Sequence, residues 1–215
     1  MHPPLIYTAL GDSLTVGVGA IMQSGLMKNY TKLSEYALKR KIVTNKFAKR
    51  KITSYEFIHY LTDPNVRNSI YHANLITITI GGNDLIQANR HFQKTNDTIV
   101  FNQALKSLKY HFETLLLTVH EIKKHTNKPF LIRVVGLYNP SPHIPYSHYW
   151  VSQFNHTLTE ITSAYGGKFV DIYPIFKKFG HRLLTIDRLH PNSSGYNMIA
   201  QELYRSGYDE LFHIK

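Results

Sequence analysis

Short apolar runs alternate with longer amphipathic stretches along the chain. The apolar runs predict strands at residues 5–10, 42–47, 74–80, 130–136 and 168–172. The amphipathic stretches predict helices near residues 27–40, 53–61, 99–126, 147–166 and 193–206. This alternation is typical of β-α-β units around a parallel sheet. In such a sheet, functional residues gather at the carboxyl ends of the strands.

The helix at residues 99–126 has the clearest pattern, because seven apolar side chains recur there at helical spacing. These are Leu105, Leu108, Phe112, Leu115, Leu116, Val119 and Ile122. No internal repeat, low-complexity tract or interdomain linker interrupts the chain of 215 residues. We therefore expect residues 1–215 to form one domain, which is large enough to bury a sizeable core.

Three polar motifs follow predicted strands. Gly11-Asp12-Ser13-Leu14 follows the first strand, where a serine can present its hydroxyl beside backbone N–H groups. Gly81-Gly82-Asn83-Asp84 follows the third, and the Asn83 carboxamide can donate to an oxyanion or cap the next helix. In Asp187-Arg188-Leu189-His190, the carboxylate can hold one ring nitrogen so that the other faces a serine. Together the motifs supply the groups needed for acyl transfer.

The three motifs, in this order and at these separations, resemble motif blocks of the GDSL esterase/lipase family of the SGNH hydrolase superfamily. The resemblance runs from about residue 5 to about residue 205, and residues 11–20 and 136–140 are most similar to bacillus-type spore germination lipases. It implies a three-layer α/β/α fold with a flavodoxin-like, parallel five-stranded sheet in the order 2-1-3-4-5. It also implies a serine esterase or lipase that hydrolyses carboxylic esters of lipids or phospholipids.

The resemblance assigns three catalytic residues: Ser13 as nucleophile, His190 as general base and Asp187 as the group that orients the imidazole. The oxyanion hole would combine the backbone N–H groups of Ser13 and Lys51 with the Asn83 side chain.

Other residues are expected to support the site. Asp12 and Asp84 would brace it through hydrogen bonds. Gly82, Tyr138 and Asn139 are the expected substrate-binding residues. An aromatic loop is the candidate acyl pocket; its residues are Tyr138, His143, Tyr146 and Trp150.

The second motif block departs from the family pattern. The family has a glycine there, whereas residues 46–54 of this chain contain none. In register with Thr53-Ser54, Lys51 takes the place of that glycine. Its backbone N–H remains available, but lysine would be strained if the position requires a positive φ.

Neither a cofactor nor a metal is expected. The chain has 13 histidines but no His-Glu-x-x-His, and His181, Asp187 and His190 lack a metal-ligand pattern. The chain has no cysteine, which excludes disulfides and thiol nucleophiles. The first residues do not read as a signal peptide, and no apolar run approaches the ~20 residues of a membrane span. We therefore expect a cytoplasmic or spore-associated protein.

The net charge of +11 is uneven, because residues 39–51 carry seven basic residues and no acidic one. One interpretation is that these lysines and arginines protect a sheet edge from pairing with another chain. Another is peripheral contact with an anionic membrane or polymer. No nucleic-acid-binding motif accompanies the charge, so no specific nucleic-acid partner is expected. The sequence does not determine the oligomeric state.

Two alternatives to a lipase remain open from the sequence. One is a deacetylase of acetylated polysaccharide, which would use the same chemistry. The other is a non-catalytic binding module whose oxyanion hole is damaged at Lys51. Acyl chain length and positional preference depend on loops that the sequence does not place.

Overall fold

The sheet has the predicted topology. The computed structural model describes residues 3–20 and 25–212. Within them, five parallel strands form one sheet in the order β2-β1-β3-β4-β5. The strands are β1 (Leu5–Gly11), β2 (Ile42–Ala48), β3 (Leu75–Thr79), β4 (Leu131–Val135) and β5 (Lys168–Val170). Each boundary lies within two residues of the expected one, and β2 is confirmed as an edge strand.

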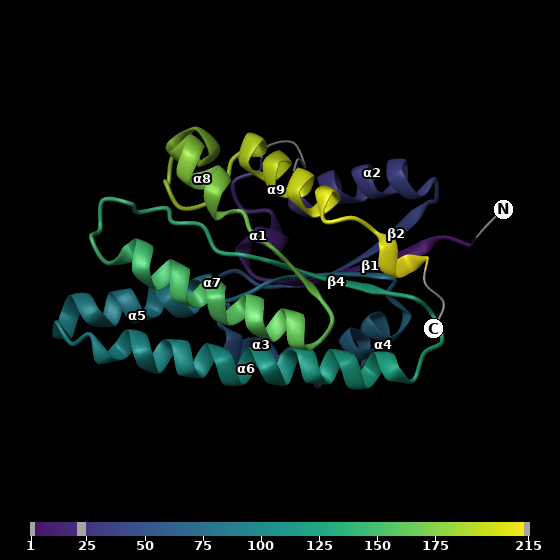
Figure 1. Ribbon diagram of the computed structural model, residues 1–215, viewed down its shortest axis with the longest axis horizontal. Coiled ribbons are helices and arrows are strands. Elements are labelled where there is room, and N and C mark those ends of the chain that lie inside the picture. Colours follow the sequence, from purple (N-terminus) through teal and green to yellow (C-terminus); the bar gives the residue numbers. More distant parts are fainter. Residues whose placement is uncertain (1–2, 21–24, 213–215) are drawn as a thin grey trace.

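Helices cover both faces of the sheet, which confirms the three-layer α/β/α architecture (Figure 1). One layer contains α2 (Leu26–Leu38), α8 (Tyr173–Phe179) and α9 (Ser193–Arg205). The other contains α3 (Ser54–Tyr60), α4 (Pro64–His72), α5 (Gly82–Thr95), α6 (Ile99–Lys124) and α7 (Ser147–Ala164). The short α1 (Ser13–Val16) begins directly beyond β1, and two 3-10 turns lie at Gly180–Leu183 and Asp209–Leu211.

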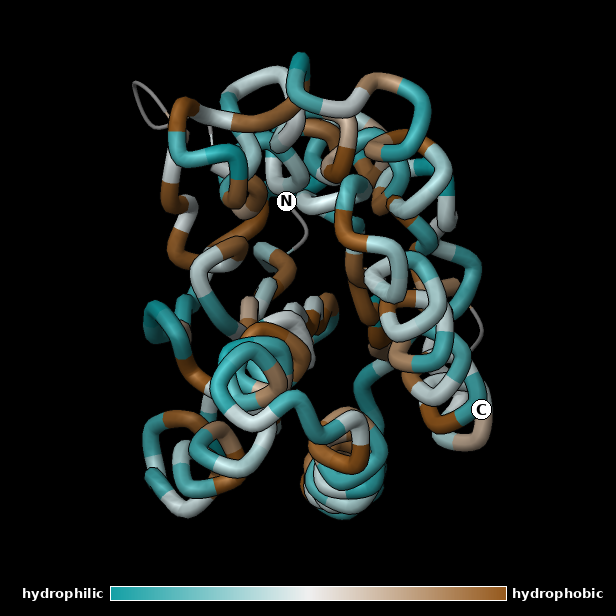
Figure 2. The backbone as a smooth tube through the Cα atoms, turned by 90° about the vertical axis from the view of Figure 1, so that its left-hand side faces the viewer, coloured by the Kyte–Doolittle hydropathy of each residue, from teal (hydrophilic) through white to brown (hydrophobic). Residues whose placement is uncertain are grey.

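Alternate side chains of each central strand enter opposite cores, as the pleat requires. In β4, Leu131 and Val135 pack beneath α2 and α9, whereas Ile132 and Val134 pack against α6 and α7. Because both faces are covered, β3 and β4 are buried along their whole length. Figure 2 shows helices end-on, with hydrophobic and hydrophilic residues alternating around them.

Four helices were not predicted from the sequence, namely α1, α4, α5 and α8. Two of them carry start signals that could have been used. Asp63 caps α4 by accepting from the Asn65 N–H at 2.7 Å, and Pro64 occupies its first turn. Pro174 lies in the first turn of α8. None of the helices in the described ranges is long and apolar enough to cross a membrane.

The loop after β2 brings Lys51 close to the end of β1. The Lys49 N–H donates to the Gly11 carbonyl at 3.1 Å, which continues the pairing of the two strands. Two residues later Lys51 has a φ of +63°, in the left-handed region that favours glycine. The side chain of Lys51 is exposed. The departure from the family's glycine therefore does strain the backbone at this position.

We predict that Lys51→Gly raises the free energy of unfolding by roughly 0.5–1 kcal/mol, because glycine adopts this φ without a steric penalty. Chemical denaturation of the two proteins would measure the difference. Arg50→Gly is the matched control, since Arg50 is equally exposed but has no positive φ, and it should give no gain. A Lys51→Gly protein that is less stable than the parent would contradict the strain.

Candidate active site

Ser13 lies at the first position of α1, directly beyond the carboxyl end of β1. The two strands β1 and β3 approach closely there. A Cβ atom at Gly11 would lie 2.2 Å from the Thr79 hydroxyl oxygen, so only glycine fits. The chain therefore turns out of the sheet at Gly11 and presents Ser13 at the start of a helix.

Asp12 fixes this turn. Its Oδ1 accepts from the Leu14 N–H at 3.0 Å and from the Thr79 hydroxyl at 2.9 Å. Its own N–H donates to the Thr79 carbonyl at 3.0 Å. The carboxyl is buried, and desolvation raises its pKa despite these hydrogen bonds. Asp12 therefore braces the turn that carries Ser13, and a bracing role was expected from the sequence.

Asp187 and His190 face each other within one tight turn. The Asp187 Oδ2 lies 2.6 Å from the His190 Nδ1. The Asp187 Oδ1 accepts from the backbone N–H groups of Leu189 and His190, each at 2.9 Å, and from the Thr185 hydroxyl at 2.5 Å. Burial by itself would raise the pKa of Asp187, but these hydrogen bonds hold it well below its usual range. The carboxylate is therefore charged and fixes the orientation of the ring.

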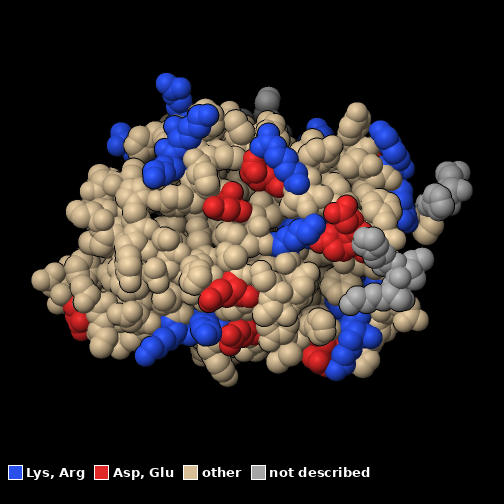
Figure 3. Space-filling view, in the orientation of Figure 1, with Lys and Arg blue, Asp and Glu red and all other residues tan. Residues whose placement is uncertain are grey.

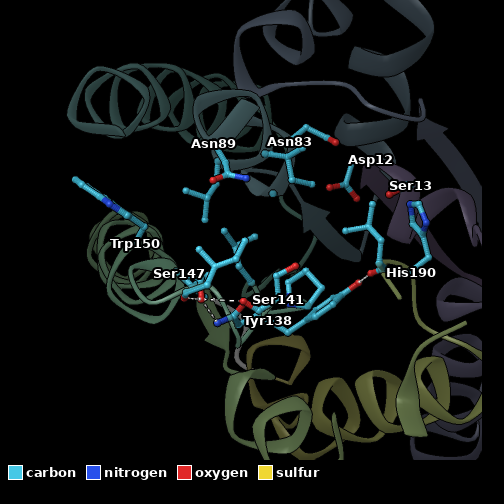
Figure 4. Close-up of a pocket in the computed structure, with 18 of the residues that line it drawn as sticks. Asp12, Ser13, Asn83, Asn89, Tyr138, Ser141, Ser147, Trp150 and His190 are labelled. Atoms are coloured by element: carbon cyan, nitrogen blue, oxygen red, sulfur yellow. Dashed lines mark hydrogen bonds between the residues drawn. The ribbon is translucent and has the colours of Figure 1, made fainter. Parts of the chain in front are cut away.

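Because Nδ1 is engaged by Asp187, the Nε2 of His190 is the ring nitrogen left for a substrate-side role. Figure 4 shows the His190 ring beside Ser13 at one end of a pocket. In the described part of the chain, no hydrogen bond joins the two side chains. Such contacts are often long without substrate and tighten in the substrate complex.

Contacts from three other segments hold the turn of His190. The Tyr138 hydroxyl donates to the Leu189 carbonyl at 2.5 Å, and its ring stacks on Phe176 at 4.1 Å. On the other side, a Cβ atom at Gly19 would lie 2.6 Å from the Pro191 carbonyl oxygen, so the loop after α1 packs directly on this turn. Tyr138, expected to bind substrate, thus also positions the turn that carries His190.

Asn83 lies in the first turn of α5, but it does not cap that helix. The N-cap residue is Gly81, with no side-chain capping bond, so the capping role considered for Asn83 is wrong. Its Nδ2 donates to the Ile52 carbonyl at 2.9 Å, which ties α5 to the loop of Lys51. An amide nitrogen carries two hydrogens, so one remains available to a ligand.

Asp84, which is buried, also joins α5 to the segment that follows Lys51. Its carboxylate accepts from the Ser54 N–H at 3.0 Å and from the Ser54 hydroxyl at 2.5 Å. Burial raises the pKa of Asp84 against these hydrogen bonds. The bracing role expected for Asp84 is thus to hold the start of α3 against α5.

A single pocket joins most of the expected residues. It has an empty volume of about 940 Å³, its open mouth included. Ser13, His190, Gly82, Asn83, Tyr138 and Asn139 all line it, and Tyr146 and Trp150 line it farther away. The pocket does not include His143 or Lys51. The Asn139 side chain binds Ser147 Oγ at 2.8 Å and the Ser141 N–H at 3.0 Å, so it shapes the loop between β4 and α7.

The sequence analysis missed most of the apolar lining. Leu85, Ile86, Phe101, Ile144 and Val151 all face the pocket. The available signal was the amphipathic character of α5 and α7, but an apolar stripe facing a pocket looks the same as one facing a core. In the described ranges, no group of three or more His, Asp or Glu side chains is placed to hold a metal ion.

Comparisons with known proteins agree with this geometry. Residues 9–198 match the GDSL-like Lipase/Acylhydrolase family. The chain is 37% identical to the spore germination lipase LipC of Bacillus licheniformis, over 96% of this chain and 98% of the relative. It is also similar to the crystal structure of the lipase Lip_vut3 from a goat rumen metagenome, at 37% identity and a TM-score of 0.90, covering 95% and 98% of the two chains.

A more distant structure shares the fold alone. The acetylxylan esterase Axe2 of Geobacillus stearothermophilus is 18% identical, with a TM-score of 0.71 and 94% and 93% of the two chains covered. The family match spans most of this chain. The chain therefore belongs to the GDSL-like lipase/acylhydrolase family, and it is a carboxylic ester hydrolase.

Proposed function

We propose that the protein hydrolyses lipid esters through an acyl-enzyme formed on Ser13. The observation that carries this proposal is the Asp187–His190 pair, held at 2.6 Å beside Ser13 at the mouth of an apolar pocket. His190 Nε2 accepts the proton of Ser13 as the hydroxyl oxygen bonds to the ester carbonyl carbon. Asp187 stabilises the imidazolium that forms.

The same groups complete the acylation and then the hydrolysis of the acyl-enzyme. The bond to the alcohol breaks, and His190 returns its proton to the departing oxygen. Water then attacks the acyl-enzyme, with His190 again as base, and releases the acid and Ser13. The backbone N–H groups of Ser13 and Lys51 and the second N–H of Asn83 would hold the oxyanion. The hydrogen bond from Asn83 to the Ile52 carbonyl supports this assignment, because it brings these donors' segments together.

The inner part of the pocket favours a fatty acyl group over an acetylated glycan. Its walls carry Ile86, Phe101, Trp150 and Val151. These aliphatic and aromatic side chains gain from contact with methylene groups, whereas an acetyl group would leave most of the pocket empty. The names of two relatives at 37% identity, both lipases, also support a lipid substrate. By the same likeness to LipC, we place the protein in spore germination, in a cytoplasmic or spore-associated setting.

We also propose that residues 39–51 contact an anionic lipid surface. The stretch follows the edge strand β2, and six of its seven basic side chains are exposed; Arg40 is half-buried and bonds the Pro3 carbonyl. Its last part, residues 49–51, reaches the carboxyl end of the sheet, where Ser13 lies. Positive charge is not confined to it, since Figure 3 shows basic side chains over α8, which carries Lys177 and Lys178. Protection of the sheet edge remains the alternative role.

The catalytic assignment predicts that the losses of kcat in single variants do not add in a double variant. Ser13→Ala and His190→Ala should each lower kcat at least about 10³-fold, and Asp187→Ala somewhat less, because Asp187 only orients the base. The His190→Ala, Asp187→Ala double variant should be scarcely worse than His190→Ala. Hydrolysis of a chromogenic ester would measure these rates, with the exposed Ser163→Ala as control. Ser13→Ala activity above a tenth of the parent's would refute the nucleophile.

The buried carboxyl of Asp12 predicts a pH dependence of stability. Burial, the largest cause, raises its pKa from 3.8 to about 6 in the folded protein. Between these values the folded state binds a proton that the unfolded state has released, so stability falls as pH rises from about 4 to about 6. Relative to Asp12→Asn, the parent should lose on the order of 2 kcal/mol of unfolding free energy across this interval. If the denaturation curves of the parent and of Asp12→Asn shift equally with pH, the pH dependence does not come from the Asp12 carboxyl.

The basic stretch predicts a dependence on lipid charge. At low salt, binding to anionic vesicles should exceed binding to neutral ones, and the excess should shrink as salt rises. Replacing Lys39, Arg40, Lys46 and Lys49 with Gln should lower affinity for anionic vesicles by about fivefold or more. The control replaces four exposed lysines of the opposite layer, Lys94, Lys106, Lys109 and Lys128. An equal loss of vesicle affinity in both quadruple variants would show an effect of net charge alone. The basic residues of 39–51 would then serve only to protect the sheet edge from pairing with another chain.

A further inference from the structure

The end of the pocket remote from Ser13 is built from a separate hydrophobic cluster. Its buried members are Ala88, Val100, Phe101 and Trp150, and they belong to neither of the two cores that flank the sheet. They come from α5, from the first turn of α6 and from α7. Figure 4 shows Asn89 and Trp150 at the end opposite Ser13 and His190. The residues here therefore meet the far end of any chain that enters from Ser13.

Tyr146 is held firmly within this cluster. Its ring packs edge-on against Phe92, with centroids 5.1 Å apart, and in a tilted arrangement against Phe101, with centroids 5.5 Å apart. Phe101 in turn stacks on Trp150 at 4.9 Å. The position of the Tyr146 ring is therefore set by aromatic packing and does not depend on its hydroxyl group.

The hydroxyl of Tyr146 makes a polar link in these apolar surroundings. It donates to the Asn89 Oδ1 at 2.9 Å, which joins the start of α7 to the middle of α5. Both residues are half-buried and both line the pocket. The neighbouring lining residues Ile86, Phe101 and Trp150 have aliphatic or aromatic side chains. The Tyr146–Asn89 hydrogen bond is thus a polar barrier, called the bar below, at the end of an otherwise apolar pocket.

We propose that the Asn89–Tyr146 hydrogen bond is the stop that limits the length of the acyl chain the pocket accepts. Each methylene group that leaves water for the apolar walls raises affinity about fourfold. A methylene that reaches the bar must either stay in water or separate two hydrogen-bonded groups, so it gains nothing. The substrates would then be esters of unbranched acyl chains up to a defined length. This inference rests on the proposed function, because it assumes that the acyl group lies in this pocket.

The test measures binding without catalysis. Trp150 is the sole tryptophan of the chain and lines the far end, so its fluorescence reports on a chain that arrives there. In a Ser13→Ala background, the protein is titrated with methyl esters of saturated fatty acids from about six to about sixteen carbons. Affinity should rise about fourfold per methylene and then level off at one length. With Tyr146→Phe added, which keeps the ring, the rise should continue beyond that length.

A second variant and a control make the result specific. Asn89→Ala breaks the same hydrogen bond from the other side, so it should extend the rise as Tyr146→Phe does, and the two together should add little. Tyr149→Phe is the control. Tyr149 also packs edge-on against Trp150, at 5.0 Å, but it is exposed and does not line the pocket. It should leave the levelling-off length unchanged.

Three results would overturn the proposal that this hydrogen bond limits chain length. Affinity could level off at the same length in all variants, the variants could lose affinity equally at every chain length, or no ester could change the fluorescence of Trp150. Hydrolysis of the same ester series by the proteins that retain Ser13 gives the parallel readout. There, Tyr146→Phe should raise the ratio of long-chain to short-chain kcat/KM by about 15-fold for a chain two methylenes beyond the limit, and by about 60-fold for three. Residual activity of Ser13→Ala would refute the proposed nucleophile, whereas the binding series would still decide whether the stop exists.

Discussion

The position of Ser13 depends on the close approach of β1 and β3 at their carboxyl ends. Without a side chain at Gly11, the two strands stay close enough for the Asp12 carboxylate to accept from the Thr79 hydroxyl and for the Asp12 N–H to reach the Thr79 carbonyl. Ser13 follows in the next position. Its direction is therefore set by the sheet itself, and a change at this junction would move Ser13 relative to every other group of the site.

The remaining groups are brought to Ser13 by hydrogen bonds between segments that are distant in the sequence. The Tyr138 hydroxyl binds the carbonyl of Leu189, and the Asn83 amide binds the carbonyl of Ile52. In both, a side chain that lines the pocket also fixes a neighbouring loop through its backbone. The same residues thus line the pocket and position its loops. The geometry of these loops is set before any ligand enters, which reduces the ordering that binding requires.

Three aspartates of the site differ in the direction of their pKa shift because their surroundings differ. Asp187 lies at the rim and accepts several hydrogen bonds, so its pKa is lowered and it is charged beside His190. Asp12 and Asp84 are buried beneath the site, and desolvation raises the pKa of each. The rim carboxylate holds the His190 ring, whereas the buried pair hold backbone turns in place. The protein as a whole is basic, and these local arrangements decide the electrostatics of the site.

The sequence by itself determined the parallel sheet and the motifs beyond its strands that carry Ser13, Asn83, Asp187 and His190. Strand periodicity and short motifs are local, so they can be read along the chain. The helices not predicted from the sequence are the short α1, α4 and α8 and the longer, amphipathic α5. Only the tertiary structure decided the left-handed backbone of Lys51 and the walls of the pocket. An apolar stripe on α5 or α7 reads the same whether it faces a core or a cavity. The link between Asn89 and Tyr146 joins residues 57 positions apart, and only packing in three dimensions brings them together.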